Sequence, residues 1–217
     1  MFGIKKRRDI KILKGFLKSN TYPPYGVVTY PINRFNSMYH NCYAHIWGLD
    51  DEQLSYLKKS EIFQLGFSVN YEFDNIFGVT KIPSEEKMEK LLFKDMKAIG
   101  VDISVAKEDE EVNEDEWKIA LYYNDKDFHF IRQNEDKSWS GKNGFSGYLQ
   151  IMRDGPRRKI ETQTGNVYHL INIYKLNISK LKQEAIEQGK RKDKSKTKVD
   201  SLKETTIGGK IKWLMKK

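Results

Sequence analysis

Apolar residues in the first half of the chain recur at the spacing of a helix. Residues 83–100, PSEEKMEKLLFKDMKAIG, give the clearest pattern, and residues 41–48 and 51–66 show weaker ones. Ser84 suits an N-cap, the glutamates after it suit the positive end of the helix dipole, and Gly100 suits the C-terminal end. The apolar stripe of this helix, which we expect to face the core, consists of Met88, Leu91, Leu92, Met96 and Ile99.

The second half changes to short segments rich in aromatic and β-branched residues, as is typical of strands. Turn signals such as Asn-Gly and Asp-Gly-Pro separate these segments. Helices followed by an antiparallel meander predict an α+β fold, in which N-terminal helices pack on a small antiparallel sheet. The predicted strands cover residues 117–123, 127–133, 138–142, 147–153 and 167–174, with a further short strand at 26–30 inside a proline-containing loop.

Charge divides the chain into two parts. Residues 175–217 hold 14 Lys and Arg against 5 Asp and Glu, whereas the rest of the chain holds 25 of each, so the net charge of +9 belongs to the end of the chain. This lysine-dense stretch has few apolar residues with which to build a core. We therefore predict a folded domain over residues 1–174 and a basic, largely unstructured tail over 175–217. The acidic run at residues 107–116 predicts a solvated loop.

The single cysteine excludes an intramolecular disulfide, which fits a reducing compartment. The basic start lacks the apolar core of a secretory signal, and no apolar run approaches the roughly 20 residues that span a bilayer. We expect a protein without an integral membrane segment. Its predicted location is the cytoplasm, or a destination reached by a route that needs no classical signal peptide.

Cys42 is the first candidate for chemistry. It follows Asn41 at the start of a predicted helix, where unpaired N–H groups and the helix dipole lower the pKa of a thiol and favour the thiolate. His129 alternates with Phe128 and Phe130 along a predicted strand, and an imidazole that faces a helix start is a general base for a thiol. The alternatives are a cysteine that only packs in the core and a half-exposed strand histidine.

Four segments together resemble the papain-like cysteine hydrolase superfamily. They are NCYAHI at 41–46, WKIALYY at 117–123, FHFIRQ at 128–133 and WSGKNG at 139–144. These segments are similar to the NCYxYA, KIAL, HWYRQ and WSHKPG motifs of a group of bacterial and phage proteins, over roughly residues 30–174. The resemblance implies a cysteine-bearing helix packed on the sheet, with Cys42 as nucleophile and His129 as base.

The chain also departs from that group, because Gly141 stands where the group has a histidine. The sequence therefore does not identify the third residue, which would orient the imidazole. Asp154 is our first candidate, since a carboxylate also stabilises an imidazolium, and Asn143 is the alternative; Asp154 equally suits a plain turn. Asn36 matches the place where papain-like enzymes keep a donor for the oxyanion, although an asparagine in a loop turn is the simpler interpretation.

His45 lies three residues after Cys42, which raises the alternative of a metal site formed by these two with His129 or His169. The chain lacks the paired cysteines of structural zinc sites and lacks an HExxH motif. We expect no metal and no cofactor. On this interpretation His45 flanks a cleft or packs, and His169 packs within its strand.

The resulting hypothesis is a cysteine-dependent hydrolase that acts on an amide bond of a protein substrate, as a protease or a deamidase. Two other classes stay open. A catalytically degenerate papain-like protein would bind a partner without chemistry, and the missing histidine at Gly141 keeps this alternative open. The basic tail could contact nucleic acid, an anionic membrane surface or a partner protein by non-specific charge attraction.

Overall fold

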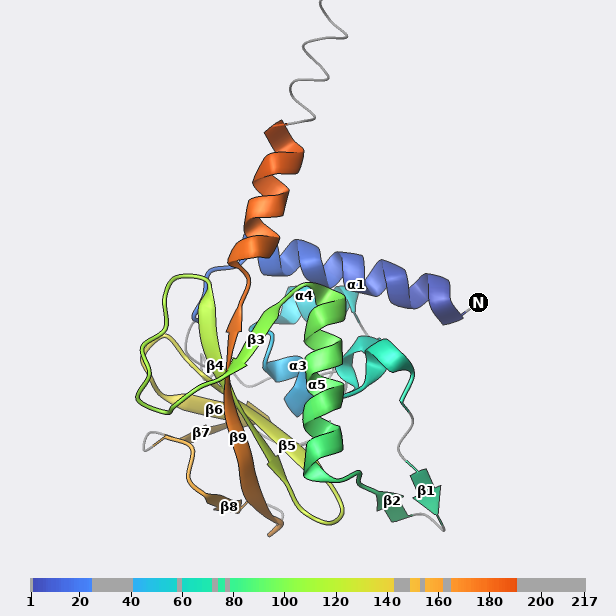
Figure 1. Ribbon diagram of the computed structural model, residues 1–217, viewed down its shortest axis with the longest axis vertical. Coiled ribbons are helices and arrows are strands. Elements are labelled where there is room, and N and C mark those ends of the chain that lie inside the picture. The colour runs from blue at the N-terminus through green and yellow to red at the C-terminus, as the bar shows by residue number, and fades with distance from the viewer. Residues whose placement is uncertain are drawn as a thin grey trace, which may run out of the picture. The chain divides into compact units, whose positions relative to one another are not determined.

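The computed structural model describes residues 2–24, 41–57, 60–71, 74–76, 79–142, 149–152, 155–161 and 165–190. The chain forms two compact units, Met1–Ser179 and Lys180–Lys217. The first unit has helices in its N-terminal half and an antiparallel sheet in its C-terminal half (Figure 1). The predicted α+β class is therefore confirmed.

The helical half contains one long predicted helix and one that the sequence analysis did not identify. Helix α5 has the predicted extent, its five-residue apolar stripe is buried, and Gly100 ends it in the left-handed conformation with a φ of 83°. Helix α1 was not predicted, although Asp9, Leu13 and Leu17 recur every four residues and are buried. The helical elements are α1 (Phe2–Ser19), α3 (Cys42–His45), α4 (Asp51–Tyr56), the 3-10 turns η1 (Glu61–Phe63) and η2 (Phe67–Val69), and α5 (Glu85–Ile99).

The strands form a two-stranded hairpin and a seven-stranded antiparallel sheet. The sheet order is β3-β9-β4-β5-β6-β7, with β8 paired to β9, so the predicted meander over β4 to β7 is confirmed and β9 returns beside β4. Strands β1, β2, β3 and β8 were not predicted, and the predicted strand at 26–30 lies outside the described residues. The strands are β1 (Asp74–Ile76), β2 (Val79–Lys81), β3 (Asp102–Val105), β4 (Glu116–Tyr123), β5 (Phe128–Gln133), β6 (Trp139–Lys142), β7 (Leu149–Met152), β8 (Lys159–Glu161) and β9 (Val167–Asn177).

Strand β9 continues past the predicted domain boundary at residue 174. Lys175 Nζ lies 2.5 Å from Glu110 Oε1, and Asn177 Nδ2 donates to Glu116 Oε1 at 2.8 Å. Lys175 and Asn177, which the sequence analysis assigned to the tail, therefore belong to the sheet. Acidic side chains of residues 107–116 hold them there. Residues 179–190 then form a helix, where the sequence predicted a largely unstructured segment. Residues 191–217 lie outside the described part of the chain.

The acidic run is a loop, as predicted, but it also covers a buried cation. Lys118 on β4 is 2% exposed, and its ammonium donates to the carbonyl oxygens of Lys107, Glu108 and Glu110, the last at 2.6 Å. An ammonium that loses its water needs such acceptors. The loop therefore encloses the Lys118 side chain while most of its own carboxylates remain in solvent.

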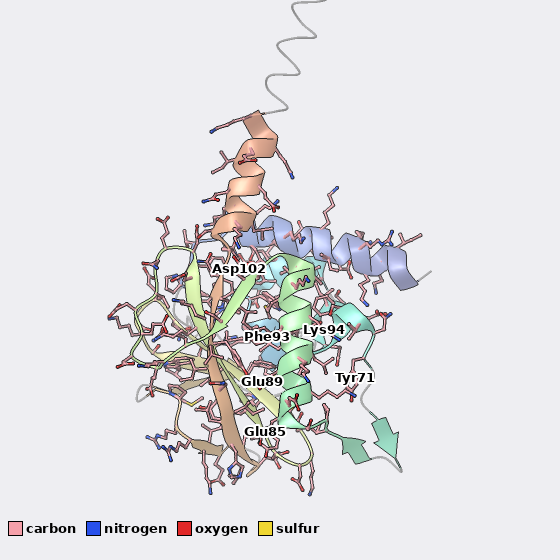
Figure 2. All side chains as sticks on the ribbon, in the orientation of Figure 1. Tyr71, Glu85, Glu89, Phe93, Lys94 and Asp102 are labelled. Atoms are coloured by element: carbon pink, nitrogen blue, oxygen red, sulfur yellow. The ribbon has the colours of Figure 1, made fainter. Side chains whose placement is uncertain are left out.

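The two faces of the sheet are covered differently. Helices α3 and α5 lie on one face, where α3 contacts β5 and β6 and where Glu89 of α5 accepts a hydrogen bond from Tyr174 Oη at 2.5 Å (Figures 1 and 2). Phe93 of α5 packs edge-on against the Tyr174 ring at 5.9 Å between centroids. The opposite face carries a second apolar cluster, which consists of Ala120, Tyr122, Ile131, Trp139, Ile160, Tyr168 and Ile173.

Asp95 joins three elements of the helical half. Its carboxylate accepts hydrogen bonds from Tyr43 Oη of α3 at 3.0 Å, from the Gly66 amide at 2.6 Å and from the Ser68 amide at 2.9 Å. The Asp95 side chain is wholly buried, and burial raises its pKa. Because each oxygen has at least one donor, the carboxylate fixes α3 relative to α5 and to η2.

We predict that Asp95→Asn lowers the free energy of unfolding by about 1.5 to 3 kcal/mol, because an amide offers one acceptor oxygen to donors that now use two. Chemical denaturation of the variant measures this difference. The control is Glu161→Gln at an exposed position of β8, for which we expect a change within about 0.5 kcal/mol. Equal stability of the two variants would contradict the role given to Asp95.

Candidate active site around Cys42

The start of helix α3 is fixed by its N-cap. Asn41 Oδ1 accepts the Ala44 amide at 2.7 Å, while Asn41 Nδ2 donates to the Phe63 carbonyl at 2.8 Å. Asn41 is thus the N-cap of α3, and the predicted helix start at this point is confirmed. Cys42 is the first residue of this helix, so the cap positions the backbone that carries the thiol.

The end of the same helix is held by side chains from three separate segments. Arg132 Nη1 on β5 donates to the His45 carbonyl at 3.2 Å, and Trp117 Nε1 on β4 donates to the Ile46 carbonyl at 2.9 Å. Tyr22 Oη donates to the Trp47 carbonyl at 2.9 Å. Carbonyl groups at a helix end have no partner inside the helix. Three buried donors satisfy these carbonyls and attach α3 to the sheet.

His45 is held by side chains of the sheet. Its Nε2 lies 2.9 Å from Ser140 Oγ on β6, and Ser140 Oγ donates to Asn134 Oδ1 at 3.0 Å. Because the hydroxyl proton goes to Asn134, His45 Nε2 carries a proton and donates to Ser140. His45 therefore packs against β6. Among the residues that the structure describes, no three His, Cys, Asp or Glu side chains are grouped as metal ligands.

The Cys42 thiol is buried, and the predicted lowering of its pKa is wrong. Cys42 is 7% exposed, and burial raises the pKa of its thiol to about 12. The N–H groups of Phe130, Tyr43 and Cys42 lower this pKa, but by less than burial raises it. A helix of four residues supplies only a small dipole, and the apolar surroundings dominate. The thiol is protonated at neutral pH.

Several other titratable groups lie within electrostatic reach of this thiol. The carboxylate of Asp127, just before β5, raises the pKa of Cys42 further. Burial raises the pKa of Tyr168 on β9, and Cys42 adds a small part of this rise. Burial lowers the pKa of Lys142 at the end of β6 to about 8, and Cys42 opposes this fall. Tyr168 Oη also donates to Asp127 Oδ2 at 3.0 Å. The thiol therefore belongs to a cluster of ionisable side chains on β6, on β9 and just before β5, of which the Asp127 carboxylate is exposed.

His129 lies next to this cluster, on the other face of β5 from helix α3. Phe130 packs on the Tyr43 ring of α3 at 5.2 Å between centroids, and residue alternation places the imidazole of His129 on the opposite face. This arrangement differs from the expectation that the imidazole faces the helix start. The ring of His129 lies instead 5.7 Å from that of Tyr168.

The imidazole of His129 is neutral. It is 3% exposed, and burial lowers its pKa to about 4. Its Nε2 has no hydrogen-bond partner among the described residues. A side chain at position 141 would come within 2.9 Å of this nitrogen, so Gly141 leaves the room that the imidazole needs. A histidine at this position would abut the His129 ring.

The structure brings together only part of the predicted site. Cys42 contacts the main chain of Phe130, the residue after His129, but no hydrogen bond joins Cys42 to His129 among the described residues. Asn36, Asn143 and Asp154 lie outside the described part of the chain. His169, which we expected to pack, is exposed on β9. It lies shortly before a β-bulge between Leu170 and Asn172 in the pairing with β4, which changes the alternation of β9.

Sequence reasoning missed three members of the cluster. Asp127 immediately precedes the histidine strand and resembles a turn residue, Lys142 resembles a solvated strand end, and Tyr168 resembles an ordinary core aromatic. One usable signal was the position of Asp127 two residues before His129, which places both side chains on one side of an extended chain. The contacts of Tyr168 on β9 with His129 and Asp127, across the intervening strand β4, have no counterpart in the local sequence.

We predict that His129 makes the protein less stable in acid. Its pKa is about 4 in the folded protein and about 6.5 in an unfolded chain, so the unfolded state binds the extra proton between these values. Its contribution is complete above about pH 6.5 and is lost as the pH falls to 4, which amounts to about 3 kcal/mol. Urea denaturation between pH 4 and pH 7 measures this loss.

The test variant is His129→Phe, which should show a shallower decline in stability than the wild type over this range. His169→Phe, at the exposed histidine of β9, is the matched control and should keep the wild-type decline. An identical pH dependence in all three proteins would contradict the buried, neutral state of His129.

In the described part of the chain, no helix is both long and apolar enough to cross a bilayer. Comparisons of the chain with known protein families, with curated proteins and with solved structures find no match.

Proposed function

We propose that the chain is a papain-like cysteine hydrolase that acts on an amide bond of a protein substrate, as a protease or a deamidase. In this proposal Cys42 is the nucleophile and His129 is the base. The order of a cysteine at a helix start followed by an antiparallel sheet with the histidine supports it, as do the segments that resemble the superfamily. No cofactor is needed for this chemistry.

One observation carries the proposal. The thiol of Cys42 lies against the main chain of β5 beside His129, within electrostatic reach of the buried Lys142 and Tyr168 and of the exposed Asp127. Buried groups with displaced pKa values are costly to a fold and gather at functional sites more often than elsewhere. A cysteine with only a packing role has no need of such neighbours.

The resting site is electrically neutral at its two central residues, so the proton must move as the bond forms. The Cys42 sulfur attacks the amide carbon, an S–C bond forms, and the thiol proton passes to the His129 imidazole, a transfer that requires this ring to reach the α3 side of β5 from the opposite face, on which it packs. The imidazole gives this proton to the leaving nitrogen as the C–N bond breaks, which leaves a thioester. Water hydrolyses the thioester, releases the carboxylic acid and restores the thiol. This sequence resembles the general-base chemistry of a serine enzyme.

The second candidate is a degenerate papain-like protein that binds a partner without catalysis. Three observations favour it: the thiol is buried and protonated, Cys42 and His129 are not hydrogen-bonded to each other among the described residues, and Gly141 replaces a histidine. The basic residues at 175–217 add a proposal based on charge alone, in which they bind an anionic surface.

We predict that the wild-type protein modifies a denatured bacterial lysate and that Cys42→Ala does not. Mass spectrometry of the treated lysate measures new N-termini, which report a protease, and amide-to-acid conversions, which report a deamidase. His129→Ala should lower the rate at any modified site by about 100-fold or more, because it removes the proton acceptor. Since the pKa of His129 is about 4, the wild-type rate should fall only as the pH drops through that value.

His169→Ala is the matched control and should retain the wild-type rate. A lysate that the wild type leaves unmodified would overturn the hydrolase proposal. Retention of the same lysate proteins by immobilised wild type and Cys42→Ala, without any modification, would favour the binding protein instead.

A further inference from the structure

Helix α1 carries the positive charge of the first unit. Its 18 residues include seven Lys and Arg and a single acidic residue, Asp9. The rest of this unit, residues 20–179, holds 19 Lys and Arg against 24 Asp and Glu. The unit is therefore an acidic domain with one basic helix, which lies at the edge of its helical half (Figure 1).

One side of α1 packs on the rest of the unit. Leu13 and Leu17 are wholly buried, and the carboxylate of Asp9 accepts a hydrogen bond from Ser60 Oγ at 2.6 Å. Just after the helix, the side-chain amides of Asn20 and Gln53 exchange hydrogen bonds of 3.0 and 2.8 Å. These contacts hold the helix in place, so the side chains on its other side also have a defined position.

The outer side of α1 carries four cations in one line, which we call the basic stripe: Arg7, Lys11, Lys14 and Lys18. Their spacing of four, three and four residues places the stripe about 130° around the helix axis from the buried line, over a length of about 16 Å. Arg7 and Lys11 are exposed, and Lys14 and Lys18 are half-buried. Among the described residues, none of the four side chains forms an ion pair or a hydrogen bond.

The basic stripe is unfavourable for the helix itself. Like charges three or four residues apart repel each other, and cations in the first turns oppose the helix dipole, which no acidic residue of the first turn offsets. Helix α5 has the ordinary arrangement, with four lysines among four acidic residues and with Lys90 Nζ 2.5 Å from Glu86 Oε1. A partner with regularly spaced negative charges, outside the domain, accounts for a stripe that has no partner within it.

The surface of α1 fits nucleic acid better than a lipid surface. A helix that binds lipid buries an apolar face among the headgroups. In α1 that face already packs in the core through Leu13 and Leu17, and Ile4, at 77%, is the only exposed apolar side chain among its described residues.

The same surface fits a duplex better than a single strand. Proteins hold single strands largely by stacking the bases on aromatic rings, and the exposed side chains described on α1 include no aromatic ring. A duplex presents one phosphate for about every 3.4 Å along each strand, so the basic stripe spans about five of them.

We propose that the basic stripe of α1 binds the phosphate backbone of double-stranded nucleic acid. Contacts to phosphates carry no information about the bases, so we expect similar affinities for duplexes of different sequence. This binding is separate from the proposed hydrolase reaction and from the charge of residues 175–217, because the stripe includes neither Cys42 nor that segment.

The experiment measures binding of the full chain to a fluorescent duplex DNA of about 20 base pairs by fluorescence anisotropy. The test variant changes the basic stripe to glutamine: Arg7→Gln, Lys11→Gln, Lys14→Gln and Lys18→Gln. The matched control changes four exposed lysines of α5: Lys87→Gln, Lys90→Gln, Lys94→Gln and Lys97→Gln. Both variants lose four positive charges and keep residues 175–217, so a difference between them belongs to α1.

We expect the stripe variant to bind the duplex about 100-fold or more weakly than the wild type at about 100 mM salt, because it releases fewer counterions from the DNA. The plot of log affinity against log salt should also become less steep by about 3 to 4, at about 0.9 for each lost phosphate contact. The α5 control should stay within about threefold of the wild type, because salt screens charges that do not touch the DNA.

Three results would overturn the inference. They are a wild type that does not bind the duplex at about 50 mM salt, an equal loss of affinity in the two variants, and an unchanged affinity in the stripe variant. The last result would assign the binding to residues 175–217. Stripe-dependent binding to vesicles of phosphatidylserine and phosphatidylcholine, without binding to the duplex, would also overturn it and assign the stripe to a membrane surface.

Should the stripe variant not fold, NMR spectra of the wild type decide. Addition of the duplex must then shift the amide signals of Lys11 and Lys14 on α1 and leave those of Lys90 and Lys94 on α5 in place. Equal shifts on both helices, or shifts on neither, would reject the basic stripe as the binding site.

Discussion

The placement of helix α3 depends on buried hydrogen bonds to its final carbonyl groups. A helix of four residues is unstable in isolation, because too few hydrogen bonds offset the cost of nucleation. Here Arg132 donates to the carbonyl of the last helical residue, Trp117 and Tyr22 donate to the next two carbonyls, and Asn41 caps the start. These donors come from segments far apart in the sequence. The position of the thiol is therefore a property of the whole domain.

The burial that secures this helix also sets the protonation of the site. Desolvation disfavours charge, so it raises the pKa of Cys42 and lowers those of His129 and Lys142. A thiolate and an imidazolium, the usual resting pair of a cysteine hydrolase, are both disfavoured here. Catalysis at such a site requires proton transfer from the thiol during the attack on the substrate, the step that the proposed function assigns to His129.

The sequence predicted those elements whose formation depends on residues close together in the chain. The apolar stripe of α5 and the strands of the meander follow directly from their periodicity. The sequence did not indicate that Lys175 pairs with Glu110, because that contact joins residues 65 positions apart. The state of Cys42 was mispredicted for a related reason. The local sequence indicated a helix start, which lowers the pKa of a thiol. The pKa of Cys42 is instead set mainly by burial against strands that are distant in the sequence.

The most direct test of this account is the contact between the cysteine and the histidine strand. In NMR spectra of the folded protein, we predict a nuclear Overhauser effect between the β protons of Cys42 and the amide proton of Phe130, since that amide lies against the thiol. Such a contact would place the sulfur beside β5, one residue from His129. Absence of this effect, in spectra that show the contact between Tyr43 and Phe130, would contradict the site.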